Sequence, residues 1–295
     1  MTSKTPAVHW PLLAGVLAAA AFVSMDVMVK LINPRFDTLQ VAFLRFASGS
    51  VFALLLWLTR MPRLPRRAQW GSHALRSVLL LLCLVSYFHA LRLLPLAQAV
   101  AMGYLAPVFV SVLAIVVLKE RPSRWLWWAI ALGLCGVAVS LLPQLQQQWL
   151  QPLGATSSPR QWEGLLAAAF SAVTFSGVMV LARQQARHDA LWTIVLVQNL
   201  LPCLLLAVPA AWVWRPMVMS DIAPVALLGF FATVGLLSLT WAFTHLEASR
   251  VAPLEYSGFV WAALLGYLVF GEVPTLYTLA SAALIIGGCL LLLRR

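Results

Sequence analysis

Charged residues are scarce in this chain, because Asp, Glu, Lys and Arg make up only 10% of its 295 residues. A soluble globular domain carries about 25% of such residues, which cover its water-facing surface. The scarcity therefore excludes an ordinary soluble surface. Together with 62% hydrophobic residues and a mean hydropathy of +0.90, it indicates an integral membrane protein whose exterior mostly faces lipid.

Acidic residues are the rarest charged class, with 9 Asp and Glu against 20 Lys and Arg, and the net charge is +11. The basic residues occur in short clusters between apolar runs, which is typical of membrane orientation rather than of nucleic-acid binding. We expect the lipid bilayer and a small-molecule substrate as partners, and no nucleic acid.

Motifs for catalysis or metal binding are absent as well. The four cysteines lie inside apolar runs, and none has the spacing of a metal site. The sequence contains no phosphate-binding loop, no zinc-protease motif and no pair of carboxylates suited to acid–base chemistry. We therefore predict no catalytic residue, no metal and no cofactor, and a protein that is not an enzyme.

Ten apolar runs are long enough to cross a membrane as helices, which takes roughly 20 residues for a core of about 30 Å. They are residues 10–31, 38–58, 74–93, 97–118, 125–142, 162–181, 190–212, 222–243, 251–270 and 275–293. The links between them carry helix breakers such as Pro34, Pro122 and Pro274. We predict an all-α protein with ten transmembrane helices, the first being a span rather than a cleaved signal sequence.

Basic residues predict the direction of insertion, since cytoplasmic loops carry an excess of Lys and Arg. With the N-terminus in the cytoplasm, the inner segments hold most basic residues, including a cluster from Arg60 to Arg76. The outer segments then hold only Arg35, Arg92, Arg160 and Arg215. We expect a multi-pass protein of the inner (plasma) membrane with both termini in the cytoplasm.

A weak internal repeat relates the two halves of the chain. A displacement of 152 residues, without a gap, pairs Tyr104 with Tyr256 and Glu120 with Glu272, together with a proline, a serine and several apolar residues. Residues 1–143 and 162–295 would each hold five spans, an odd number, so the second half inserts upside down. Residues 144–161 are the expected linker. Two inverted five-helix repeats are typical of secondary transporters, with a substrate site near the membrane midplane.

The residues around this repeat resemble a known family. They are Ala-Leu-Arg-Leu-Leu-Pro at 90–95, Tyr-Leu-Ala-Pro-Val-Phe at 104–109, Leu-Lys-Glu-Arg at 118–121 and Gly-Glu-Val-Pro at 271–274. They are similar to the EamA-type permeases of the drug/metabolite transporter superfamily. The resemblance implies a ten-span carrier that uses alternating access without ATP hydrolysis, and it is strongest to exporters of amino acids, including aromatic ones. One departure is Phe259, which stands where the first half has Pro107.

Four ionisable residues lie within predicted spans: Asp26, Lys30, Arg45 and Glu255. A charge in a membrane interior is costly unless it is paired or faces water, so each is a candidate gate or coupling residue. Asp26 and Lys30 are four residues apart and could pair, or Arg45 could reach Asp26 instead. The alternative is structural: fixed ion pairs, Lys30 and Arg45 extending to the outer surface, and Glu255 reaching the cytoplasm.

Aromatic and hydroxyl residues form a second candidate group. The predicted substrate-binding residues are Ser24, Tyr87, His89, Tyr104, Ser238, Trp241, Tyr256 and Trp261. Their rings could stack on a substrate and their hydroxyls could bond its polar groups. His89 could also couple transport to protons. The structural alternative is packing between helices, with hydroxyls bonded to their own helix, and Gln198 and Asn199 could likewise only join helices.

These observations predict a secondary transporter that exports amino acids or related small metabolites by alternating access, and a monomer is compatible with this function. A membrane-embedded enzyme is one alternative, which would need a polar catalytic group near one interface. A structural membrane protein without transport activity is another, which would not need an inverted repeat.

Overall fold

The computed structural model describes residues 9–60, 65, 69–106, 109, 113, 127–128, 131–136, 138–139, 142–143, 159–185, 189–245 and 257–292. Regular secondary structure in these residues is entirely helical, which confirms the all-α prediction for them. The helices are α1 (His9–Ile32), α2 (Thr38–Arg60), α3 (Trp70–Leu93), α4 (Leu96–Gly103), α7 (Pro159–Gln185), α8 (Leu191–Trp212), α9 (Met219–His245), α11 (Ser257–Phe270) and α12 (Leu276–Leu292).

Six of these helices are long and apolar enough to cross a membrane. They are α1, α2, α3, α7, α8 and α9, and each coincides with a predicted span to within a few residues. α11 and α12 are apolar but have only 14 and 17 residues. The predicted span 125–142 is described only in short helical pieces. The protein is thus a multi-pass membrane protein, while the number of ten spans stays a prediction.

The predicted span 97–118 differs from the structure, because its helix is interrupted. α4 ends at Gly103, and the N–H of Tyr104 bonds to the carbonyl of Ala101, as in a turn. The sequence gives the reason: Pro107 offers no N–H to the carbonyl of Gly103, and a proline ring clashes with the carbonyl four residues earlier. In the second half, Phe259 stands at the position that corresponds to Pro107, and it lies within α11.

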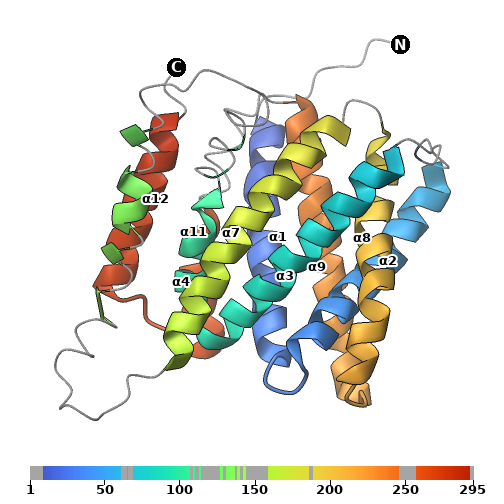
Figure 1. The fold of residues 1–295 in the computed structure, drawn as a ribbon, viewed down its shortest axis with the longest axis horizontal. Coiled ribbons are helices and arrows are strands. Elements are labelled where there is room, and N and C mark those ends of the chain that lie inside the picture. The colour runs from blue at the N-terminus through green and yellow to red at the C-terminus, as the bar shows by residue number, and fades with distance from the viewer. Residues whose placement is uncertain are drawn as a thin grey trace.

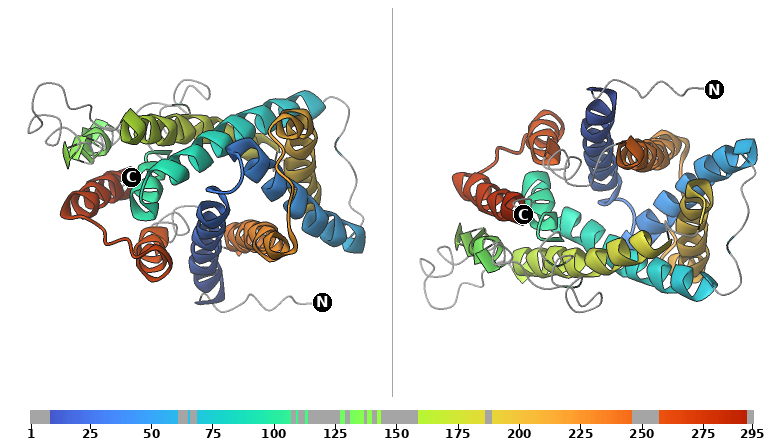
Figure 2. Two further views of the ribbon diagram at one scale, coloured as in Figure 1. Left: turned by 90° about the horizontal axis from the view of Figure 1, so that it is seen from below. Right: turned by 90° about the horizontal axis from the view of Figure 1, so that it is seen from above.

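Helices of the first half lie mainly against helices of the second half (Figures 1 and 2). α1 lies beside α9, α3 beside α7, and α2 beside α8, while α4 contacts α11. α1 also contacts α11, and α4 contacts α7. In the predicted repeat, α1, α2, α3 and α4 correspond to α7, α8, α9 and α11. Exchanging the two halves then turns the pair α1–α9 into α3–α7 and the pair α1–α11 into α4–α7. The pairs α2–α8 and α4–α11 stay the same.

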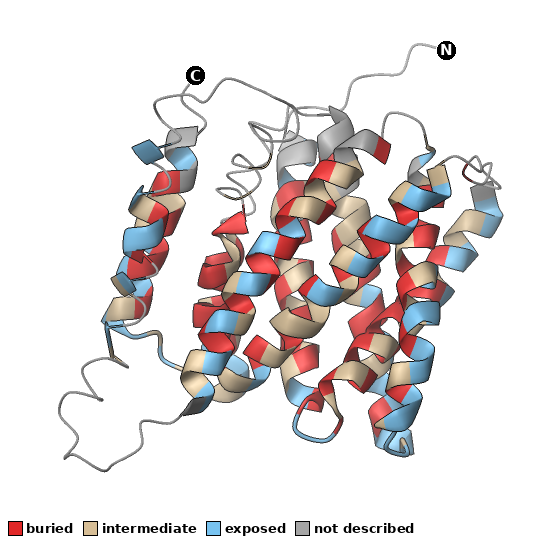
Figure 3. Ribbon diagram, in the orientation of Figure 1, coloured by how far each residue is buried: buried red, intermediate tan, exposed pale blue. Residues whose placement is uncertain are grey.

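Exposed residues recur along the helices of the bundle (Figure 3). Many of them are large and apolar, as expected for contact with lipid: Leu17, Leu204 and Leu268 are 54%, 61% and 65% exposed. Large side chains such as Phe46 and Phe88 are instead fully buried between the helices. An apolar exterior over an apolar core is stable only in a membrane.

The bundle has two ends that carry different links. The distal end, as defined here, carries the α1–α2 turn and the links α3–α4, α8–α9 and α11–α12. The proximal end is the one where α1 begins, α12 ends and the α7–α8 link lies (Figure 1).

A glycine allows the close approach of α9 to α2. A Cβ atom on Gly229 would lie 2.7 Å from the backbone carbonyl carbon of Ser48, which cannot rotate away. We expect Gly229→Ala to destabilise the folded protein by about 1–3 kcal/mol, since overpacking forces the helices apart. The measurement is the thermal unfolding midpoint of detergent-solubilised protein. Gly287→Ala on α12 is the matched control, because no atom lies within 4 Å of its added Cβ. Equal midpoints for the two variants would contradict this packing.

Candidate functional site

At the distal end, one lysine connects three segments that are far apart in the sequence. Lys30 lies in the last turn of α1, and its Nζ forms an ion pair with Glu272 in the α11–α12 link. The same Nζ donates to the carbonyl of Leu94 at 2.9 Å and lies 5.1 Å from the centre of the Phe270 ring. Oε2 of Glu272 accepts the N–H of Leu96 at 2.8 Å. Lys30, Leu94, Leu96 and Glu272 are named the distal seam below.

The local sequence explains why these groups meet. Pro95 separates α3 from α4, so the N–H of Leu96 at the start of α4 lacks a partner within its helix. A carboxylate is favourable at a helix N-terminus, and Glu272 supplies it. Gly271 follows α11 with φ of +67°, a conformation that glycine adopts readily, and so turns the chain toward this place.

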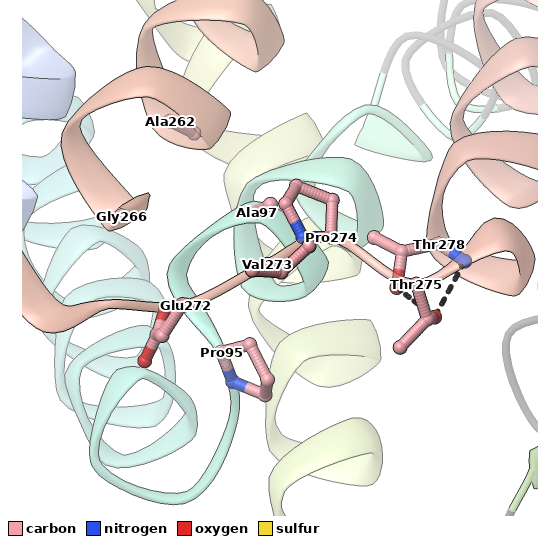
Figure 4. A pocket seen from close by; sticks show the side chains of 9 residues that line it. All are labelled: Pro95, Ala97, Ala262, Gly266, Glu272, Val273, Pro274, Thr275 and Thr278. Carbon is pink, nitrogen blue, oxygen red and sulfur yellow. Dashed lines mark hydrogen bonds between the residues drawn. The ribbon is translucent and has the colours of Figure 1, made fainter. Parts of the chain in front are cut away.

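A small cavity adjoins the distal seam (Figure 4). It is lined by Pro95, Ala97, Ala262, Gly266, Glu272, Val273, Pro274, Thr275 and Thr278. Its volume of about 30 Å³ holds one or two water molecules. Sites for small molecules are typically about 300–1,000 Å³. This part of the structure is therefore closed to a metabolite.

A second set of polar contacts joins the α1–α2 turn to the α8–α9 link at the same end. Nη1 of Arg35 donates to Oδ1 of Asp221, a buried residue in the first turn of α9, at 2.5 Å. The side chain of Gln40 exchanges two hydrogen bonds with the backbone of Arg215, at 2.8 and 2.9 Å. These contacts hold the distal ends of α1, α2 and α9 together.

The proximal end has a comparable cluster between α3, α7 and α8. Nε2 of His73 lies 3.0 Å from Oδ2 of Asp189, and both side chains are buried. Arg76 donates to the side-chain oxygens of Gln185 and Gln198 at 2.7 and 2.9 Å. Arg76 was counted above with the inner basic cluster, but in the structure it lies on α3 and is buried against neighbouring helices. Polar contacts between the two halves thus occur at both ends of the bundle.

Between the two ends, a carboxylate on α1 meets a tyrosine on α3. The hydroxyl of Tyr87 on α3 donates to Oδ2 of Asp26 on α1 at 3.0 Å. Tyr104 directly follows α4 and packs against the same hydrophobic core as Tyr87. Its hydroxyl also lies only 2.8 Å from where a Cβ of Gly258 on α11 would be. Asp26, Tyr87 and Tyr104 are therefore gathered where α1, α3, α4 and α11 meet.

A buried arginine connects α2 and α8. Nη1 of Arg45 donates to Oδ1 of Asn199 at 2.8 Å, and its guanidinium lies 4.5 Å from the centre of the Phe46 ring. The amide nitrogen of Asn199 donates to the carbonyl of Val195. Gly49 provides the space, because a Cβ there would lie 2.6 Å from the side-chain oxygen of Asn199.

The pairings considered from the sequence differ from those in the structure. Lys30 pairs with Glu272 rather than with Asp26, and Arg45 bonds to Asn199 rather than to Asp26. Within the described residues, Asp26 has a tyrosine partner and no basic one. The reason is that Lys30 finds two acceptors side by side, the carbonyl oxygen of Leu94 and the carboxylate of Glu272. Asp26 on the same helix would offer only one of these groups, a carboxylate.

The other predicted site residues are dispersed. The hydroxyl of Ser24 donates to a carbonyl of its own helix at 2.8 Å. Nε2 of His89 on α3 lies 2.7 Å from Oε1 of Glu163 on α7, and the side chain of Glu163 is largely exposed. Ser238 and Trp241 lie on the last turns of α9, near the proximal end.

Three predicted residues concern the last helices. Trp261 lies on α11 and packs against the main hydrophobic core. Glu255 and Tyr256 lie outside the described residues, as does Glu120, the repeat partner of Glu272. Among the described residues, no group of three or more His, Cys, Asp or Glu side chains could hold a metal ion.

Comparison with known proteins identifies the family. The sequence model of the EamA-like transporter family matches residues 9–142 and, separately, residues 162–294. The chain belongs to the EamA-like transporter family. As a member of it, this protein is a membrane transporter, and the resemblance noted from residues 90–121 and 271–274 is confirmed.

Relatives of this EamA-like transporter move different small molecules. A pseudopaline exporter of Pseudomonas aeruginosa is 29% identical, over 96% of this chain and 95% of its own length. An S-adenosylmethionine uptake transporter of Rickettsia bellii is 24% identical, over 97% and 92%. A solved crystal structure matches with a TM-score of 0.65 at 21% identity over 96% of both chains, which supports the fold alone.

Sequence reasoning missed several of the residues that join the halves. Glu272 was noted for its place in the repeat, and His73, Asp189 and Asp221 were not considered. A usable signal was the scarcity of acidic residues, with 9 in the chain, because an acidic side chain at the end of an apolar run needs a partner. Which residue becomes that partner depends on tertiary structure.

The distal seam predicts how access from the distal end is controlled. Glu272→Gln keeps an acceptor for the N–H of Leu96 but removes the charge that pairs with Lys30. We expect the seam to open more often, so that a cysteine at Thr278, in the adjoining cavity, reacts faster with a membrane-impermeant thiol reagent. The expected gain is about threefold to tenfold, since a charged hydrogen bond contributes roughly 1.5–3 kcal/mol, part of which water replaces.

The labelling is done after replacement of the four native cysteines by alanine. Glu163→Gln is the matched control, because it removes a carboxylate that pairs with His89 on an exposed part of the surface. Equal labelling rates for Glu272→Gln and Glu163→Gln would show that the Lys30–Glu272 ion pair does not limit access.

Proposed function

We propose that this protein is a secondary transporter that exports amino acids, aromatic ones included, or related small metabolites by alternating access. The observation that carries the proposal is the closed distal seam, where Lys30 and Glu272 join the two halves beside a cavity too small for a metabolite. An alternating-access carrier must close one end of its pathway while the other is open. The distal seam is such a closure at one end.

The two halves, residues 1–143 and 162–295 joined by the linker 144–161, are proposed to be inverted five-helix repeats with ten spans in total. Support comes from the two separate family matches and from helix pairs that exchange when the halves exchange. The polar clusters agree with this relation. At the distal end, Asp221 at the start of α9 bonds to Arg35 of the α1–α2 turn. At the proximal end, His73 near the start of α3 bonds to Asp189 of the α7–α8 link.

The distal seam is suited to reversible opening. The side chains of Lys30 and Glu272 are 15% and 25% exposed, so both ions are already partly hydrated. Water can replace the contacts of such a pair when it opens, and the net cost is far smaller than for a deeply buried pair. A substrate that binds the open state more tightly than the closed state can supply this difference.

The distal end is proposed to be the outer end. This orientation puts the basic cluster between Arg60 and Arg76 in the cytoplasm together with both termini, as the positive-inside rule requires. The protein would then reside in the plasma membrane, where an exporter takes substrate from the cytoplasm. The contacts between the halves at the two ends lie within one chain, which agrees with a functional monomer.

Transport by purified protein in liposomes tests the proposed function. Labelled amino acids and a wider panel of metabolites are loaded inside, and efflux is compared with that from protein-free liposomes. We expect at least one compound to leave faster through the protein. Absence of transport for the whole panel would contradict the carrier function and favour an enzymatic or structural role.

A pair of tyrosine variants makes this assay specific to the interior. Tyr104→Ala removes an aromatic ring and its hydroxyl from the meeting point of α1, α4 and α11. We expect transport per folded molecule to fall at least about fivefold, since the loss of one hydrogen bond alone costs about 1 kcal/mol. Tyr267→Ala is the control, because Tyr267 lies on the exposed surface of α11. Equal rates for the two variants would remove Tyr104 from the pathway.

A further inference from the structure

Three charged side chains that are buried in membrane-spanning helices each keep one polar atom without a hydrogen-bond partner among the described residues: Asp26, Arg45 and Arg76. Arg76 belongs to the proximal cluster, where it donates to two glutamine side chains, whereas Asp26 and Arg45 lie outside that cluster. Asp26 is 5% exposed and Arg45 is 6% exposed, and both lie within helices that cross the membrane. Neither belongs to an ion pair within the described residues. The seam and the proximal cluster do not involve them.

Asp26 has one bonded and one unbonded carboxylate oxygen. Oδ2 accepts the hydroxyl of Tyr87 at 3.0 Å, whereas Oδ1 is buried without a hydrogen-bond partner in the described part of the chain. A buried carboxylate oxygen without a donor is strongly unfavourable in a membrane. A ligand with cationic N–H groups, such as an ammonium, would supply the missing donor and the missing charge.

Arg45 has the complementary deficiency. Nη1 donates to Asn199, and the guanidinium lies over Phe46, but the Nε–H is buried without an acceptor among the described residues. A neutral amide such as Asn199 satisfies one donor and leaves the positive charge uncompensated. Guanidinium groups bind carboxylates through two parallel N–H donors, and Nε is commonly one of them. A carboxylate is thus the ligand that Arg45 lacks.

The two residues lie at similar depth. Asp26 lies roughly two helical turns before α1 ends, and Arg45 lies roughly two turns after α2 begins, so both are about 10 Å from the distal ends of their helices. α3 and α9 each pack against both α1 and α2. The two charges therefore lie at one level of the bundle, within a group of four neighbouring helices.

We propose that Asp26 and Arg45 are the two poles of a binding site for zwitterionic metabolites, of which amino acids are the simplest. Oδ1 of Asp26 accepts from the ammonium group, with Tyr87 positioning the carboxylate. The guanidinium of Arg45 donates to the substrate carboxylate, with Asn199 positioning the arginine. The inference rests on the proposed carrier function and adds to it the zwitterionic character of the substrate and the atoms that select it.

This assignment accounts for the electrostatics of transport. When both side chains are ionised, Asp26 and Arg45 contribute one negative and one positive charge, and a zwitterion adds one charge of each sign. Each buried charge gains an opposite partner when the substrate binds, and the net charge of the site stays unchanged. A substrate that carries only an ammonium or only a carboxylate would leave one pole unpaired, which is costly in a desolvated site.

Binding to the purified wild-type protein in detergent tests the proposal. The ligands are the twenty common amino acids, each beside its N-acetyl derivative, which lacks the ammonium, and its methyl ester, which lacks the carboxylate. Dissociation constants are measured by titration calorimetry. We expect at least one amino acid to bind about tenfold or more tightly than both of its derivatives, since an unpaired buried charge is costly.

Charge-removing variants assign the two poles. Asp26→Asn should weaken binding of the amino acid and of its methyl ester but not of its N-acetyl derivative. Arg45→Gln should weaken the amino acid and the N-acetyl derivative but not the methyl ester. Asp37→Asn and Arg92→Gln are matched controls, because Asp37 caps the start of α2 and Arg92 is exposed at the end of α3. Both should leave the ratios unchanged.

The proposal is overturned if the wild-type protein binds no amino acid, or binds an amino acid and its derivatives equally. It is also overturned if each variant weakens all three ligands by the same factor, as a purely structural role would predict. If a variant does not fold, the wild-type comparison alone decides. Transport of other metabolites by a protein that shows no zwitterion preference would leave the carrier function standing and reject only this site.

Discussion

The membrane interior offers no water to polar groups, and the structure depends on this constraint. A buried charged side chain there is favourable mainly when it has a partner, and several such partners come from distant segments. Lys30 reaches the α11–α12 link, Arg76 reaches α7 and α8, and Arg45 reaches α8. A chain with 10% charged residues has few such groups, so each pair strongly restricts how the two halves can be assembled.

The polar pairs differ in burial, and this difference suits different roles. Lys30 and Glu272 lie near the distal end and are partly hydrated, so water can replace their contacts when they separate. Asp26 and Arg45 lie deeper and each keeps an unbonded polar atom. Water cannot easily reach these unbonded atoms, whereas a bound ligand can form hydrogen bonds with them. In this account the peripheral pair controls access, and the interior charges recognise what is carried.

Much of the fold was predictable, because an apolar run long enough to cross a membrane satisfies its backbone hydrogen bonds by forming a helix. The break at Gly103 was also encoded, since Pro107 removes the partner of its carbonyl, although the sequence analysis drew a continuous span. The site was less predictable. Asp26, Lys30 and Arg45 were identified as costly charges, but the ion pairs considered joined Asp26 to Lys30 or to Arg45. The actual partner of Lys30 is 242 residues away, which only tertiary packing determines.

Separation of the distal seam is the central claim, and a distance measurement tests it most directly. Spin labels at Leu31 and Val273, both exposed neighbours of the ion pair, report on the gap between α1 and the α11–α12 link. Pulsed electron paramagnetic resonance in lipid nanodiscs, after replacement of the native cysteines, should show two distances. Their populations should change when a transported substrate is added. A single distance that is the same with and without substrate would contradict the account.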